Sequence, residues 1–305
     1  YGEVGDGDGD GDGDGEDGDG EDDGAASAEL PYVFEMPSTS KGLDALLRLG
    51  GGSAAREREI LHRLIAGHHT RLADENKAKL AALANLLLRR LEREADAAPQ
   101  PRAPTMDALC GALSSIAALV KGPVLNAMKE RIAAATVKWQ TKAAAAVRRA
   151  AAAALRAHRE ERRAAKAEGR AAAPRKKPRV AHVAIDVSAL VLCRLAARMY
   201  TVSDYKHPVL TPAAALMREV LSQRAHELAA PPPTPTTRTA LRREIYLLAL
   251  TLEYCGGATR YCAEAYTALV ALLRALLKPP RAGAAAAHPL AVRRPASTAS
   301  AAAAA

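Results

Sequence analysis

The sequence predicts an all-α protein of paired antiparallel helices, flanked by two tails without a core. Three observations predict this class. Alanine supplies 72 of the 305 residues and aromatic residues only 3%, whereas β-sandwiches and barrels draw on β-branched and aromatic side chains. Ala, Leu and Arg, which dominate here, are among the strongest helix formers. Apolar residues recur at helical spacing through most of the chain from Leu43 onward.

The two ends are predicted to be disordered for different reasons. Residues 1–40 carry 14 acidic and no basic side chains. Within them, residues 1–29 form a Gly/Asp-rich tail in which like charges repel and glycine resists ordering. Residues 279–305 are rich in Ala, Pro and Arg and supply almost nothing that a core could bury.

Residues 30–139 are predicted to form a first helical region, opened by an anchor segment that contains LPYVF. Helices are expected at 54–66, 74–95, 106–120 and 123–139. The 74–95 segment has the clearest apolar stripe, because Leu80, Leu83, Leu87 and Leu91 share one helical face. Residues 97–105 hold three prolines and are predicted to form a loop.

Residues 140–182 are predicted to form a basic, Ala/Arg-rich helix or linker insertion, since they hold almost no large apolar side chain. The helix expected from residue 123 can run through Trp139 to about residue 168, with its second half an exposed helix or a helix–coil mixture. Residues 183–278 then resume packed helices, expected at 184–200, 212–228, 238–255 and 261–278. The packed segments read as four pairs at roughly 40–50-residue spacing, which is typical of HEAT or armadillo solenoids. The spacing is irregular and no residue signature repeats, so an irregular helical bundle stays open as the alternative.

The sequence predicts a non-enzymatic protein with no catalytic, cofactor-binding or metal-binding residues. Phosphate-binding glycine loops, nucleophile motifs and zinc-ligand spacings are missing from it. The four cysteines form no CxxC pair, and three of them lie in apolar helical patterns as small hydrophobes. No charge-free apolar run reaches membrane-spanning length, so no membrane partner is expected.

Charge points to a polyanionic partner. Residues 41–305 carry a formal charge of +23, and residues 138–182 hold 14 Lys or Arg against three acids. Such runs contact phosphates without reading sequence. A solvated charge run is the equal alternative. The densest points, and therefore the candidate RNA-phosphate contacts, are Arg148, Arg149, Arg162, Arg163, Lys176 and Lys177.

Candidate protein contacts lie in three short segments. Tyr32, Val33 and Phe34 are the predicted anchor for a partner, because aromatic residues in otherwise mobile segments often become interface hot spots. A short segment pinned to the helical body itself is the favoured alternative for these residues. The other candidates are Asn76, Lys77 and Lys79 at a helix start, and His207 and Pro208 in a loop. For the last two, shaping a turn is the favoured interpretation.

Four blocks in order resemble one known family. They are LPYVFEMP at 30–37, LADENKAKLAALANLLLRRL at 72–91, SDYKHPVLTPAAALMREVL at 203–221 and LTLEYCGGATRYCAEAYTALVALL at 250–273. Together they resemble the nucleolar protein fourteen family, a component of the small-subunit processome. The family's long N-terminal portion has no counterpart in these residues, so a central-to-C-terminal fragment is expected. The 140–182 segment resembles an insertion and inherits no family role.

The resemblance implies a non-enzymatic scaffold of the small-subunit processome. Such a scaffold is required for small-subunit ribosomal RNA processing and small-subunit biogenesis, and acts in the nucleolus with a box C/D small nucleolar ribonucleoprotein. The implied partners are a nucleolar-complex-four-type protein and a pseudouridine methyltransferase, with pre-ribosomal and small nucleolar RNA contacted directly or indirectly. The alternative is a generic helical-repeat scaffold for protein interactions with no RNA role.

Overall fold

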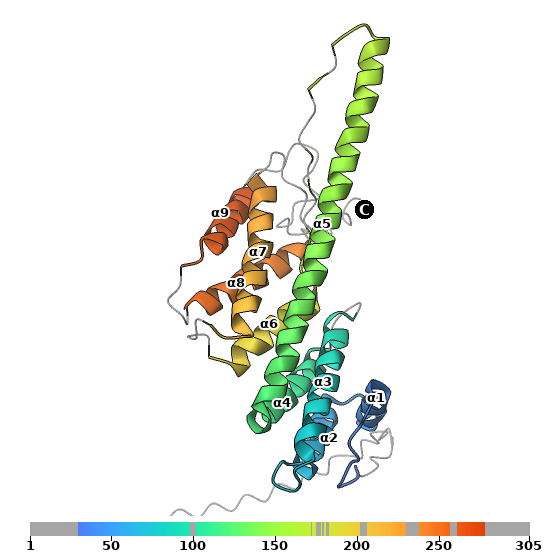
Figure 1. The fold of residues 1–305 in the computed structure, drawn as a ribbon, viewed down its shortest axis with the longest axis vertical. Helices are drawn as coiled ribbons and strands as arrows, with labels where there is room; N and C mark the ends of the chain where they lie inside the picture. The colour runs from blue at the N-terminus through green and yellow to red at the C-terminus, as the bar shows by residue number, and fades with distance from the viewer. Residues whose placement is uncertain are drawn as a thin grey trace, which may run out of the picture. The chain divides into compact units, whose positions relative to one another are not determined.

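The structure is a computed structural model that describes residues 30–97, 102–171, 173–174, 178, 180, 183–201, 206–229, 238–256 and 261–277. Those residues contain nine α-helices and no β-strand (Figure 1). The predicted tails at 1–29 and 279–305 lie outside the described residues. The helices are α1 (Ser40–Arg48), α2 (Ala54–Gly67), α3 (Asn76–Ala95), α4 (Ala103–Leu119), α5 (Lys121–Ala167), α6 (Val187–Met199), α7 (Leu210–Ala229), α8 (Arg238–Gly256) and α9 (Ala263–Leu277).

Helix α3 lies at the centre of the packing, in contact with α1, α4, α5 and α6. The leucine stripe predicted for 74–95 is confirmed, because its side chains are completely buried. Leu88, outside that stripe, is equally buried because α3 has neighbours on several sides. Each fully buried leucine contributes about 1.5–3 kcal/mol relative to an exposed one, so this helix supplies much of the apolar stabilisation. The fully buried leucines are Leu80, Leu83, Leu87, Leu88 and Leu91.

Consecutive pairing of the helices is only partly observed. The expected pair of 54–66 with 74–95 is wrong: α2 packs extensively on α4, and α3 also packs on α4. In the second half the main partner of α7 is α9, while contacts of α6 with α7 and α8 with α9 are smaller. The helices therefore interleave rather than stack as a regular solenoid. Which helix covers an apolar face depends on long-range fit, which the periodicity of one segment does not contain.

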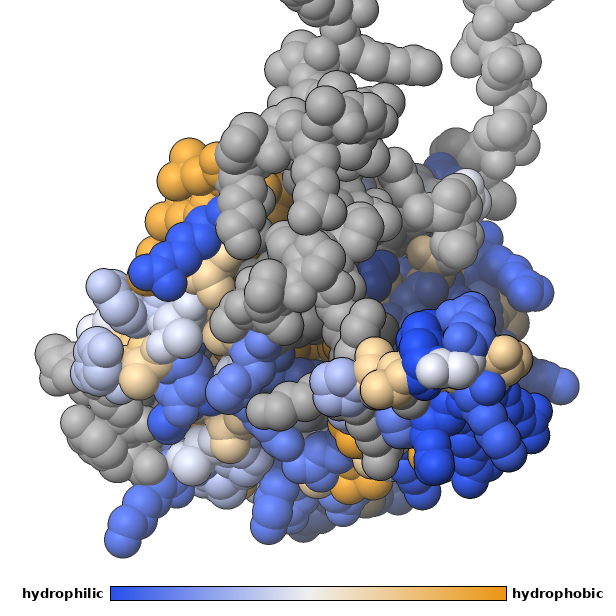
Figure 2. Space-filling model, turned by 90° about the horizontal axis from the view of Figure 1, so that it is seen from above, coloured by the Kyte–Doolittle hydropathy of each residue, from blue (hydrophilic) through white to orange (hydrophobic). Residues whose placement is uncertain are grey.

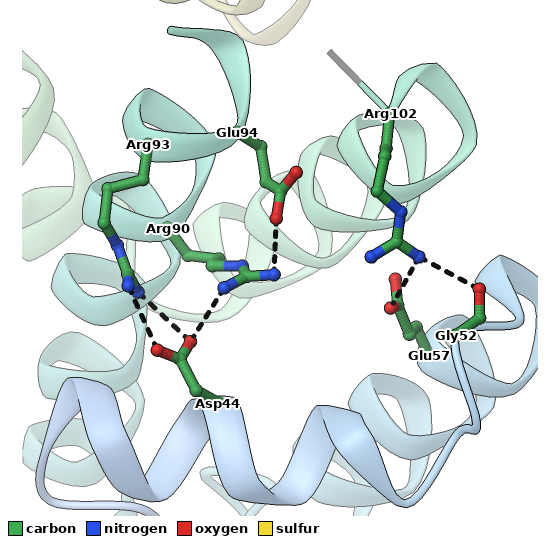
Figure 3. Close-up of polar contacts among 7 residues, drawn as sticks. All are labelled: Asp44, Gly52, Glu57, Arg90, Arg93, Glu94 and Arg102. Atoms are coloured by element: carbon green, nitrogen blue, oxygen red, sulfur yellow. Dashed lines mark hydrogen bonds and ion pairs between the residues drawn. The ribbon is translucent and has the colours of Figure 1, made fainter. Parts of the chain in front are cut away.

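An ion-pair cluster holds α1 on α3 (Figure 3). Asp44 of α1 accepts hydrogen bonds from Arg90 at 3.1 Å and from Arg93 at 3.0 and 3.1 Å. Arg90 also pairs with Glu94 one turn along α3. Burial alone raises the pKa of Asp44, but the Arg93 hydrogen bond and the nearby guanidinium charges outweigh it and hold that pKa below its ordinary value.

A second contact, between Arg102 and α2, fixes the loop after α1. The Arg102 guanidinium donates to the Gly52 carbonyl at 2.9 Å and to the buried Glu57 carboxylate at 3.2 Å (Figure 3). Gly51 and Gly52 have φ of 60° and 82°. An L side chain is strained in that conformation, so the three-glycine run serves the turn between α1 and α2.

Helix α5 runs unbroken from Lys121 to Ala167 and joins the predicted first region to the predicted basic insertion. Its first half is packed through Val124, Met128 and Ile132. Trp139 closes this packed half: it is 5% exposed, and its indole N–H donates to the Val183 carbonyl at 3.0 Å. The sequence expectation that one helix extends to about residue 168 is confirmed.

Polar contacts tie the later helices together. The Tyr254 hydroxyl donates to the Cys193 carbonyl at 2.6 Å, joining α8 to α6. Arg218 of α7 makes a two-point contact with Glu264 of α9 at 2.8 and 3.1 Å. These contacts, together with buried apolar residues of α6 to α9, give the C-terminal helices their own core.

Replacing Asp44 with alanine should lower the free energy of unfolding by about 1–3 kcal/mol at neutral pH, because hydrogen bonds to charged groups contribute this much and Arg90 loses one partner. A folded-state pKa below the unfolded one means that the contribution is complete above the ordinary aspartate pKa and disappears as pH falls through the folded pKa. Urea unfolding across this range should therefore show the two proteins converging in acid. A difference that persists in acid would contradict this account.

Replacing Trp139 with alanine should lower the free energy of unfolding by about 3–5 kcal/mol, because a large buried side chain leaves a cavity. Trp139→Phe should cost less, since an aromatic ring stays in the site and the losses are the hydrogen bond to Val183 and part of the buried indole volume. Val147→Ala is the matched control on the same helix: Val147 is 47% exposed, so its loss should stay within about 0.5 kcal/mol. Urea unfolding followed by circular dichroism measures all three. Equal losses at 139 and 147 would show that Trp139 does not anchor α5.

Candidate nucleic-acid interface

The second half of α5 presents seven cationic side chains, and all seven are exposed. At about 100° per residue, they fall within an arc of about 140° around the helix axis. The acids Glu161 and Glu168 lie on the opposite side, and Glu160 lies at the edge of the arc. We call these seven residues the basic face: Arg148, Arg149, Arg156, Arg159, Arg162, Arg163 and Lys166.

The side of α5 that faces away from the basic face is covered. Ala146 and Ala165 are buried, and Ala143, Ala150 and Ala154 are half-buried. Alanine lets neighbouring chain approach closely while still favouring the helix. The Ala/Arg composition therefore gives an amphipathic helix, with a small-residue side that is covered and a cationic side in solvent.

The basic face has no acidic partner among the described residues. Other cations of α5 differ. Lys138 and Lys142 both pair with Asp186 just before α6, at 2.9 and 2.7 Å. Burial alone raises the pKa of Asp186, but hydrogen bonds from the two lysines outweigh it and lower that pKa. Lys138 and Lys142 thus dock the first half of α5 on the segment before α6. The cations of its second half have no acidic partner among the described residues.

Arg170, which follows the end of α5, is paired with carboxylates, as Lys138 is. It pairs with Glu161 at 2.7 Å and with Glu168 at 2.5 Å, and hydrogen bonds to these carboxylates raise its pKa. Because both acids are engaged by Arg170 on the far side of the helix, they do not neutralise the basic face. The positive potential of that face is therefore directed outward.

Figure 2 views the molecule from above, so that the upper end of α5 in Figure 1 points toward the reader. Hydrophilic residues gather on the right, the side on which the end of α5 lies in Figure 1, and a hydrophobic area lies on the left, the side of α9. The basic face lies on α5, which also exposes Val137 and Val147, whereas the larger group of exposed apolar side chains lies on α8, α9 and the turn before α9. The exposed large apolar residues of α8 and α9 and the turn before α9 are Ile245, Tyr246, Leu252, Tyr261, Tyr266, Leu273 and Leu277.

The sequence identified only the doublets of the basic face. Arg148, Arg149, Arg162 and Arg163 lie on it, whereas Lys176 and Lys177 lie outside the described residues. The RNA-phosphate contacts predicted from the sequence did not include Arg156, Arg159 and Lys166. A signal for them exists in the sequence: spacings of 7 from 149 to 156 to 163, and from 159 to 166, return to the same side of a helix.

The predicted anchor divides into buried and exposed residues. Phe34 is 4% exposed and packs into the helical body, while Tyr32 is 87% and Val33 69% exposed. The Arg63 guanidinium lies 6.0 Å from the centre of the Tyr32 ring, within cation–π range. Phe34 therefore fixes the segment, and Tyr32 and Val33 are the two residues that a partner can reach.

The candidates at the start of α3 also differ from one another. Asn76 is 5% exposed, and its side-chain amide donates to the His69 carbonyl at 3.2 Å, so it shapes the turn before the helix. Lys77 is exposed and Lys79 is half-buried, and they pair with Asp74 and Glu75 at 3.4 and 2.6 Å. Exposed pairs of this kind contribute little to stability.

His207 begins α7. Its ring Nδ1 accepts hydrogen bonds from the backbone N–H groups of Val209 and Leu210, each at 3.2 Å, and its ring lies 4.5 Å from that of Tyr200. These N–H groups belong to the helix start, where capping acceptors are needed. Pro208 is exposed beside it. The geometry agrees with the turn-shaping interpretation of these two residues.

Neither of the two cysteines whose pKa is shifted carries an activated thiol. Burial raises the pKa of Cys193 to about 12, and burial with the nearby Asp107 carboxylate raises that of Cys110 to about 11. Both are neutral at pH 7. Cys110, Cys193 and Cys262 form no disulfide, and the part of the chain that is described holds no cluster of three or more potential metal ligands. None of the described helices is both long and apolar enough to cross a membrane.

Comparison with known proteins agrees with the resemblance found in the sequence. Nucleolar protein 14 of Mus musculus is 25% identical over 250 residues, which make up 82% of this chain and 24% of that protein. This chain therefore spans about a quarter of that relative's length. The profile of the Nop14-like family matches residues 7–304. Since the match covers nearly the whole sequence, the chain belongs to the Nop14-like family.

Proposed function

We propose that this chain is part of a non-enzymatic scaffold of the small-subunit processome, required for processing of small-subunit ribosomal RNA and for small-subunit biogenesis. The family match over residues 7–304 carries the proposal. The relative's name, nucleolar protein 14, supports action in the nucleolus. A box C/D small nucleolar ribonucleoprotein is the particle with which the scaffold acts in this proposal.

The helical body is suited to hold several partners at once. Among the exposed apolar side chains, two groups are candidates for partner contacts: the Tyr32–Val33 anchor and the side chains of α8 and α9. Contiguous exposed apolar residues mark protein interaction sites. The proposed protein partners are a nucleolar-complex-four-type protein and a pseudouridine methyltransferase. Tyr32 and Val33 are the residues we assign to such a contact.

RNA contact is the second part of the proposal. The basic face of α5 supports it, because seven unpaired, exposed cations on one side of a helix attract phosphates. Pre-ribosomal RNA and small nucleolar RNA are the polyanions available to a processome component. The apolar surfaces of α8 and α9 favour the alternative, a scaffold that contacts proteins alone.

Depleting the protein from cells should cause unprocessed small-subunit ribosomal RNA precursors to accumulate, while large-subunit precursors are processed as before. Northern blots of total RNA measure both. Re-expressing the wild-type protein should restore processing. Equal accumulation of precursors of both subunits, or of neither, would contradict a role in small-subunit assembly.

Replacing both Tyr32 and Val33 with serine in the re-expressed protein should reduce the amount of processome proteins that co-purify with it several-fold. The matched control replaces Leu49 and Leu72, which are 52% and 66% exposed elsewhere on the surface. Quantitative mass spectrometry of the purified particles compares the two variants. Loss of partners from both variants, or from neither, would show that the anchor is not a specific contact.

A further inference from the structure

We infer that the basic face of α5 binds the sugar–phosphate backbone of double-helical RNA without reading its bases. The choice of RNA over DNA rests on the proposed function; the choice of a duplex rests on the geometry of the face. Three features of the face support a duplex as the ligand. They are the residues between the cations, the straightness of the array and its confinement to one side of the helix.

The residues that share the arc with the cations cannot recognise a base. Between Arg148 and Lys166 the arc of about 140° contains only Ala152 and Leu155 besides the seven cations. Neither has a side-chain hydrogen-bonding group or an aromatic ring. Proteins that bind single strands rely on aromatic platforms for stacking. Sequence readers place side-chain hydrogen-bonding groups, arginine among them, at base edges, but the deep, narrow major groove of an RNA helix keeps side chains away from those edges. On an RNA duplex the face therefore acts through its charge.

The cations form a rigid line. From Arg148 to Lys166 the helix is about 27 Å long, at 1.5 Å per residue, and Figure 1 shows α5 as one straight helix. Arg149, Arg156 and Arg163 repeat every seven residues along one edge of the arc. A rigid array binds a rigid, densely charged ligand without ordering it first, whereas a flexible single strand loses conformational freedom on binding.

The cations cover one side only, so the helix lies along a backbone rather than inside a groove. A helix buried in a groove meets phosphates on both flanks, but the opposite side of α5 carries partly covered alanines and the acids Glu161 and Glu168. Ala146 and Ala165 are buried there, and Trp139 and Asp186 hold the base of the helix in place. These contacts therefore hold the cations of the basic face in a fixed position.

The test measures binding of the full chain to a short mixed-sequence RNA duplex by fluorescence anisotropy across a series of salt concentrations. If all seven cations engage phosphates, the logarithm of the affinity should fall against the logarithm of the salt concentration with a slope of about −5 to −6. That slope corresponds to a roughly 10³-fold loss between about 50 and 200 mM salt. Oligouridine of equal charge should bind more weakly, and duplexes of different sequence should bind equally.

Replacing Arg149, Arg156 and Arg163 with glutamine should reduce the slope to about −3, since four cations remain. Glutamine retains helix propensity, and circular dichroism confirms that each variant keeps its helix content. The matched control, Lys41→Gln with Lys77→Gln and Lys79→Gln, removes the same charge from α1 and the start of α3, where Lys41 and Lys77 are exposed and Lys79 is half-buried, and should leave the slope unchanged.

Three results would overturn the inference. Equal losses in the triple variant and the control would show that binding follows net charge. Tighter binding of oligouridine than of the duplex would assign the face to single strands. Absence of binding to either RNA at low salt would make the face a solvated surface. None of these bears on precursor processing in depleted cells, so the proposed scaffold function stands or fails on its own measurement.

Discussion

The leucine stripe of α3 is the constraint on which the rest of the structure depends. A chain with one alanine in every four residues and 3% aromatic residues has few bulky side chains to bury, and α3 concentrates five fully buried leucines in one helix. Helices α1, α4, α5 and α6 all pack against it. Polar contacts supplement this sparse apolar packing, as the Asp44 cluster does between α1 and α3.

Helix α5 shows how the same composition serves two purposes. Its first half carries Val124, Met128, Ile132 and Trp139 into the body. Its second half has nothing of that size to bury, and stays helical because Ala and Arg favour the helix. The cations there are free for a polyanion because the body does not need them for folding. The proposed scaffold therefore separates a protein-contacting body, with apolar surfaces at Tyr32 and on α9, from an RNA-contacting helix.

Periodicity predicted the helices well but not their partners. The all-α class, the stripe of α3 and the length of α5 follow from local preferences, which the sequence contains. The pairing of α2 with α4 and the Asp44–Arg93 contact join residues far apart in the chain, so they depend on fit that no local pattern records. Asn76, one of the candidate contacts, is buried and hydrogen-bonds to His69, because a polar side chain at a helix start can serve a turn as well as a partner. Recognising the full basic face from the sequence requires the helical angle of every cation, whereas the arginine doublets are visible as adjacent residues.

Hydrogen–deuterium exchange of the intact protein, with and without duplex RNA, tests the central claim most directly. In the free protein the amides of α3 and of α5 up to Trp139 should exchange slowly, and those from 148 to 167 faster, because few buried contacts hold that half. Addition of the duplex should slow exchange in 148–167 and leave α3 unchanged. Protection that arises in the helical body while 148–167 stays unaffected would contradict the division of the molecule into a packed scaffold and an RNA-binding helix.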